Sequence, residues 1–113
     1  MKRRSFLYAS LATLCAALPV RAQPSWPAKT IRLIVPFSPG SGTDSAGRVL
    51  AQALSERLGQ QVIVENRAGA FGQIAAELVA RSPADGYTVF MTTNTTHGAN
   101  PHLFNRLPYD PIR

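Results

Sequence analysis

The chain has 113 residues, with 12 lysines and arginines against six aspartates and glutamates, and a formal net charge of +6. Four of the cations lie in the first 22 residues, so residues 23–113 hold eight cations and six acids without a basic cluster. This balance argues against a nucleic-acid partner. The single cysteine, Cys15, also lies in the first 22 residues, so the rest has no disulfide framework and no thiol nucleophile.

The first 22 residues have the features of an export signal. Three cations at positions 2–4 precede an apolar stretch over 6–20, and we expect cleavage between Ala22 and Gln23. The stretch is shorter than the roughly 20 residues that cross a bilayer. The motif RRSFL also fits a twin-arginine signal, and Sec export stays open. We therefore expect a cleaved signal peptide and a periplasmic protein.

The next segments predict a strand followed by a helix. Residues 31–35 are mostly apolar and β-branched, which favours a buried strand, and Pro36 ends it. A helix follows and stops at Gly59. Possible caps at its start are Ser41, Thr43 and Asp44. Its apolar side, expected to face the core, consists of Ala46, Val49, Leu50, Ala53, Leu54 and Leu58.

The remaining pattern completes an α/β unit. We expect a strand at 62–64, a helix at 74–79, a strand at 87–92 and a polar loop over 93–101, with Asn100 as a helix cap before a proline. The order βαβαβ with short connections predicts a parallel sheet with right-handed crossovers. With the first strand central, the strand order is 2-1-3, and a ligand crevice forms where the crossovers diverge.

Two polar loops, 36–44 and 93–101, then line one cleft. The first combines glycines with a helix start, which favours a carboxylate or a phosphate. The second adds hydroxyl, imidazole and amide groups. Neither loop contains lysine or arginine, so binding would depend on dipoles. The predicted ligand-binding residues are Ser38, Gly40, Ser41, Gly42, Thr43 and Asp44 in the first loop, and Thr95, Thr96, His97 and Asn100 in the second.

Catalytic and cofactor motifs fit less well. Ser41, His97 and Asp44 could form a hydrolytic triad, but Asp44 is explained more simply as a helix-start residue. The segment 40–47 lacks the third glycine of a dinucleotide fingerprint and the lysine of a P-loop. His97 has only His102 as a possible histidine partner for a metal. We expect no cofactor, no metal and no enzyme activity.

Three segments, in order and spacing, resemble the substrate-binding receptors of tripartite tricarboxylate transporters, also called Bug receptors. They are WPAKTIRLIVPFSPGSGTD, LSERLGQQVIVENRAGAFG and ARSPADGYTVFMTTNTTHGANPHLFNRLPYDPIR. The resemblance implies a fold like class II periplasmic binding proteins, in which two α/β lobes close on a small carboxylate. It also implies delivery of the ligand to membrane transporter subunits, and we expect a monomer.

The resemblance extends to individual loop residues. The family's first ligand loop is matched by Pro36, Phe37, Pro39, Gly40, Ser41 and Asp44, and its later loop by Thr95, His97, Asn100 and Pro101. A third loop, 66–72, has Ala68 where the family has proline and Phe71 where glycine is usual. The Phe71 ring either narrows the cleft or lines it for an apolar part of the ligand.

Residues 23–113 are expected to be the first, incomplete part of one lobe, truncated before the second. Half of a clamp leaves the ligand exposed to water, which competes for its hydrogen bonds, so the chain alone should bind weakly or not at all. An exported α/β hydrolase and a nonfunctional truncated remnant stay open as alternatives. The sequence does not decide which carboxylate is bound.

Overall fold

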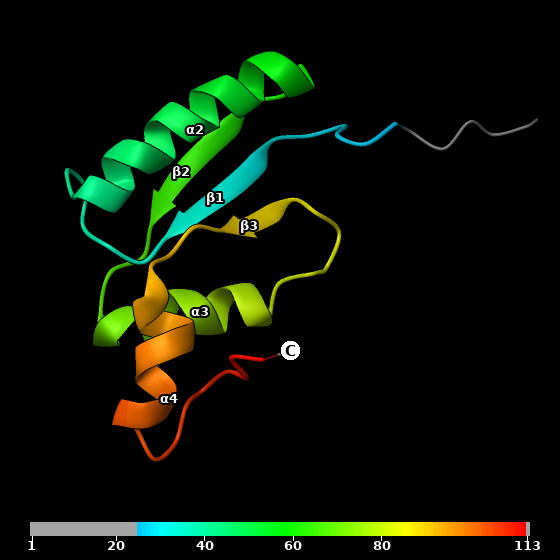
Figure 1. The fold of residues 1–113 in the computed structure, drawn as a ribbon. Coiled ribbons are helices and arrows are strands. Elements are labelled where there is room, and N and C mark those ends of the chain that lie inside the picture. Colours follow the sequence, from blue (N-terminus) through cyan, green and yellow to red (C-terminus); the bar gives the residue numbers. More distant parts are fainter. Residues whose placement is uncertain (1–24, 113) are drawn as a thin grey trace, which may run out of the picture.

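The computed structural model describes residues 25–112, and Figure 1 shows a small parallel sheet between helices. The expected signal peptide, residues 1–22, lies outside the described residues. Within 25–112, no helix is both long and apolar enough to cross a membrane. The elements in chain order are β1 (Ile31–Val35), α2 (Gly42–Leu58), β2 (Val62–Asn66), the 3₁₀ turn η2 (Ala70–Gly72), α3 (Gln73–Ala80), β3 (Thr88–Phe90), the π-helical turn η3 (Thr95–Ala99) and α4 (Asn100–Leu103).

The sheet has the predicted order β2-β1-β3, and both pairings are parallel. Ile31 lies opposite Val62, and Leu33 lies opposite Val64 on one side and Val89 on the other. Helix α2 covers one face of the sheet and α3 the other (Figure 1). The predicted α/β class is thereby confirmed, and the carboxyl ends of all three strands meet at one edge.

Strand β1 forms the centre of the core. Ile31 and Leu33 are buried together with Ala51 of α2 and Val62 of β2. Successive side chains in a strand point to opposite faces, so Ile34, which is also buried, faces the α3 side. Burial on both faces explains why this strand is a nearly continuous apolar run.

The predicted core side of α2 is partly wrong. Ala46, Val49, Leu50 and Ala53 are exposed, and Val49 is 72% exposed. The buried positions of the helix are Asp44, Gly47 and Ala51 instead. A Cβ added at Gly47 would lie 3.3 Å from Val35 Cγ2. The small residues Gly47 and Ala51 allow α2 to approach β1 closely. They, and not the larger apolar residues, determine which side of α2 faces the sheet.

Both ends of α2 agree with the sequence. The Ser41 hydroxyl accepts a hydrogen bond from the N–H of Asp44 at 3.2 Å, so Ser41 is the N-cap. Gly59 ends the helix with φ 65°, in the left-handed region that glycine adopts readily. Its N–H donates to the carbonyl of Ser55.

The third strand and the segment after it differ from the prediction. Strand β3 is shorter than the expected 87–92, and residues 95–103 are helical rather than an open loop. The N–H of Asn100 donates to the carbonyl of Thr95, five residues earlier, which is the wide spacing of a π-turn. Asn100 is therefore the first residue of α4 and not its N-cap, which is Ala99. Pro101 lies in the first turn of α4, as expected.

The close approach at Gly47 gives a stability prediction. Gly47→Leu should lower the free energy of unfolding by about 1–3 kcal/mol, because the added side chain overpacks the contact with Val35 and Met91. Leucine is the better helix former, so the loss must come from packing. The control is Ala46→Leu on the exposed side, which should change stability by less than about 0.5 kcal/mol. Urea unfolding followed by circular dichroism measures the stability of both variants. Equal losses of stability in the two would contradict the close packing of Gly47 against β1.

Candidate functional site

Three loops meet at the carboxyl edge of the sheet, around Gly72. Its φ is 81°, and an added Cβ would lie 2.6 Å from Thr96 Cγ2 and 3.3 Å from Pro36 Cβ. Only glycine fits between these two side chains. The loop after β1, the segment entering α3 and the turn before α4 lie at this end of the molecule (Figure 1). The two predicted ligand loops are therefore neighbours across a single glycine.

A buried carboxylate organises the first loop. Asp44 is 2% exposed, and its Oδ2 accepts from the N–H of Gly40 at 2.9 Å and from Arg48 Nε at 3.0 Å. Its Oδ1 accepts from Asn66 Nδ2 at 2.8 Å. The same Asn66 nitrogen donates to the carbonyl of Phe37 at 3.0 Å. These bonds tie the loop after β1 to the end of β2.

Those donors hold the pKa of Asp44 at about 2, below its usual 3.8. The Arg48 side chain is the largest cause, followed by the N–H of Gly40 and the amide of Asn66. Asp44 is therefore ionised at neutral pH, and its charge is balanced by Arg48. Because Asp44 already accepts from the Gly40 amide, that predicted ligand contact is engaged within the loop.

The start of α2 leaves donors available beside this cluster. Ser41 accepts from Asp44, and the first bond inside the helix runs from the N–H of Ser45 to the carbonyl of Ser41. The amides of Gly42 and Thr43 come before that bond, so they have no acceptor within the helix. They lie at the positive end of a 17-residue helix dipole. Gly42 is exposed and Thr43 is partly exposed.

The second predicted loop is built on two buried side chains. Thr96 Oγ1 lies 3.1 Å from Thr92 Oγ1 and 2.8 Å from His97 Nδ1. Asn100 Nδ2 donates to the carbonyl of Phe71 at 3.0 Å and to the hydroxyl of Tyr109 at 3.1 Å. The Tyr109 hydroxyl in turn donates to the carbonyl of Thr96. Thr96 and Asn100 thus serve as internal supports.

The predicted ligand residues divide into two groups. Asp44, Thr96 and Asn100 are buried and hydrogen-bonded internally, but Asn100 Oδ1 is a buried atom without a partner among residues 25–112. The others are exposed or partly exposed in the loops at the carboxyl edge: Ser38, Gly40, Ser41, Gly42, Thr43, Thr95 and His97. The side chain of His97 lies on the α3 side, where it lines a small pocket of about 110 Å³ with Phe90 and Tyr109. The His97 ring lies 6.1 Å from the rings of both Phe90 and Tyr109. These aromatic neighbours and the bond to Thr96 set the position of the imidazole.

Three residues with structural roles at this edge were not predicted. Asn66 bridges two loops, Gly72 separates the loops after β1 and β3, and Tyr109 supports the third. Asn66 is the last residue of β2, just beyond its apolar run, and this position is a signal that points to the carboxyl edge. Tyr109 is buried, and nothing in its neighbourhood in the sequence indicates its two polar partners.

The alternative triad does not assemble. Ser41 Oγ is engaged by the N–H of Asp44, and His97 Nδ1 is paired with Thr96. The Asp44 carboxylate accepts hydrogen bonds from Gly40, Arg48 and Asn66, and within residues 25–112 no hydrogen bond joins Asp44 to His97 or His97 to Ser41. Among residues 25–112, no three histidine, cysteine or acidic side chains gather as metal ligands.

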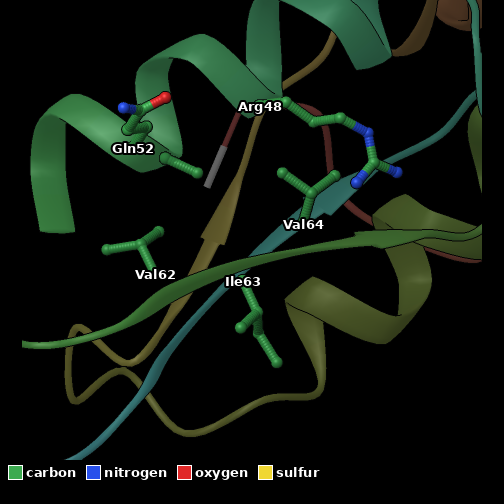
Figure 2. A pocket seen from close by; sticks show the side chains of 6 residues that line it. Arg48, Gln52, Val62, Ile63 and Val64 are labelled. Carbon is green, nitrogen blue, oxygen red and sulfur yellow. The ribbon is translucent and has the colours of Figure 1, made fainter.

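A separate groove of about 450 Å³ lies between α2 and β2. Figure 2 shows Gln52, Val62 and Val64 around it, while Ile63 points to the other side of the strand. Its lining residues are Arg48, Ala51, Gln52, Val62, Ile63 and Val64. Arg48 connects this groove to the loop cluster formed by Gly40, Asp44 and Asn66, because its guanidinium bonds to Asp44. The groove follows the edge strand and does not include the loops at the carboxyl edge.

Comparison with known proteins defines the class. A solved periplasmic transporter is 47% identical with a TM-score of 0.75, covering 78% of this chain and 30% of that one. An R. palustris protein solved with adipate is 43% identical with a TM-score of 0.73, covering 76% of this chain and 29% of that one. MatC from Rhodopseudomonas palustris, solved with bound malate, is 38% identical with a TM-score of 0.72, covering 76% of this chain and 29% of MatC. The fold is that of part of a periplasmic binding protein.

The sequence profile described as "Tripartite tricarboxylate transporter family receptor" matches residues 46–113. Protein BugT of Bordetella pertussis is 48% identical over 85 residues, which cover 75% of this chain and 26% of BugT. The chain belongs to this receptor family, as the resemblance implied. It spans about a third or less of the length of the curated relatives that it matches.

The pairing of Asp44 gives a pH prediction. Because its pKa is about 2 in the folded chain and ordinarily 3.8, the charged form is favoured by folding. This stabilisation is present above pH 3.8 and is lost as the pH falls through about 2. Asp44→Asn should therefore flatten the decline in the free energy of unfolding across this range, measured by urea unfolding at each pH.

Glu65 provides the matched control for that measurement. Its pKa is also lowered, chiefly by a hydrogen bond from Arg32, so part of the acid decline belongs to it. Glu65→Gln and Asp44→Asn should each remove a separate part, and the double variant should remove both. An Asp44→Asn variant with the full decline of the unchanged chain would show that Asp44 is not paired as described.

Proposed function

We propose that this chain is the part of a periplasmic solute receptor that holds the carboxylate of a small organic acid, without catalysis. The observation that carries the proposal is the start of α2, where the amides of Gly42 and Thr43 have no acceptor within the helix. They lie at the edge that also carries Thr95 and His97. Amides at a helix start bind carboxylates and phosphates without a countercharge.

The charge balance of the loop cluster favours an anion. Asp44 by itself would oppose a second negative group, but Arg48 bonds to it directly and cancels most of its charge. The helix dipole then dominates locally. Relatives solved with adipate and with malate support a carboxylate over a phosphate as the natural ligand.

The remaining features of the proposal concern the whole protein. Residues 1–22 act as an export signal, and residues 23–113 form the first part of a ligand-binding lobe. The receptor acts as a monomer and delivers its ligand to the membrane subunits of a tripartite transporter. The family to which the chain belongs supports this assignment.

Gly42 allows a direct test of the helix amides. Gly42→Pro removes the N–H at the first helical position, where proline is well tolerated, and Ser41 already has the extended conformation required before proline (φ −67°, ψ 161°). The control is Gly42→Ala, which keeps the N–H and has open space for its Cβ. Loss of a hydrogen bond to a charged group should weaken succinate binding by about tenfold or more.

The sequence alone allowed weak binding or none, and the exposed amides at the start of α2 now predict weak binding, with millimolar affinity. The measurement is a ligand-observed NMR titration with succinate, which detects binding in that range. Gly42→Ala should bind within about twofold of the unchanged chain, while Gly42→Pro should bind at least tenfold more weakly. Equal dissociation constants for the two variants, or no succinate binding by the unchanged chain, would refute the helix-start site.

A further inference from the structure

On the basis of the proposed carboxylate site, we infer that Phe71 determines ligand specificity and selects acids that carry a phenyl or similarly flat apolar group. The inference starts from the backbone. Ala70 and Phe71 both have positive φ, 48° and 54°, in the left-handed region that glycine adopts far more readily. Residues held in such a conformation need support from their surroundings, and they concentrate at ligand sites.

The support for Phe71 comes from the buried framework of the site. Asn100, which is fully buried, donates from Nδ2 to the Phe71 carbonyl at 3.0 Å. The next residue, Gly72, is in contact with Pro36 and Thr96. Phe71 is thereby fixed at the point where the loops after β1, β2 and β3 meet.

Core packing does not account for the ring itself. Phe71 is 67% exposed, and its ring lies against that of Phe104, at 5.8 Å between centroids with the planes tilted by 53°. A leucine, a valine or a glycine would expose less apolar surface here. A large apolar ring kept in an unfavourable backbone conformation at a polar edge is explained if a ligand covers it.

The chemistry of the loops indicates what that ligand offers. The loops 36–44 and 93–101 supply amides, hydroxyls and an imidazole but no cationic side chain. A carboxylate held at the α2 start leaves the body of the acid at this edge, where the exposed ring of Phe71 offers an apolar surface. An apolar group placed against the ring removes both surfaces from water, and aromatic pairs gain further from tilted or offset stacking.

Succinate and phenylsuccinate test the inference, because they share two carboxylates and differ by one phenyl group. The unchanged chain should bind phenylsuccinate about three- to tenfold more tightly than succinate. Phe71→Gly should lose this preference and keep the affinity for succinate within about twofold. Folding is not at risk in this variant, since glycine relieves the positive φ.

Leu103→Ala is the matched control, because Leu103 is also 67% exposed and ends α4 next to Phe104, whose ring contacts that of Phe71. It should retain the preference for phenylsuccinate. Three results would overturn the role of Phe71 alone. The unchanged chain could bind succinate and phenylsuccinate equally well, the preference for phenylsuccinate could survive Phe71→Gly, or Leu103→Ala could remove it to the same extent. No binding of either acid would instead refute the carboxylate site on which the inference rests.

Discussion

The buried carboxylate of Asp44 is the interaction on which the candidate site depends. A charge with 2% exposure is tolerated only with full hydrogen bonding, and Gly40, Arg48 and Asn66 provide it. Since these partners come from the loop, the helix and the second strand, satisfying Asp44 brings all three into one arrangement. The first turn of α2 is thereby held at the carboxyl edge with its amides facing outward, before any ligand arrives.

Small residues supply the second constraint, which is steric. Gly47 allows α2 to lie against β1, and Gly72 allows the loop after β2 to pass between Pro36 and Thr96. Packed interiors tolerate few added atoms, so neither position has room for a side chain without movement of its neighbours. The spacing of the two polar loops is therefore set by the contacts of Pro36 and Thr96 with the backbone at Gly72.

The fold was predictable because its signals are local. A buried β-branched run ending at Pro36, a cap at Ser41 and a stop at Gly59 define strand and helix, and the βαβαβ order then restricts the topology to a few choices. The inward side of α2 was not predictable from hydrophobic spacing, because Gly47 and Ala51 pack by being small. The internal role of Asn100 was missed because its partner Phe71 lies 29 residues away along the chain. That of Thr96 was missed although its side-chain partners, Thr92 and His97, are near in the sequence.

The most direct test of the central claim is an amide NMR map of the ¹⁵N-labelled chain titrated with succinate. The helix-start site predicts that the largest shifts occur at Gly42 and Thr43, with smaller shifts at Thr95 and His97, while the groove along Val62–Val64 is unaffected. Shifts concentrated along that groove, or an absence of saturable shifts at Gly42 and Thr43, would contradict the claim that the start of α2 receives the carboxylate.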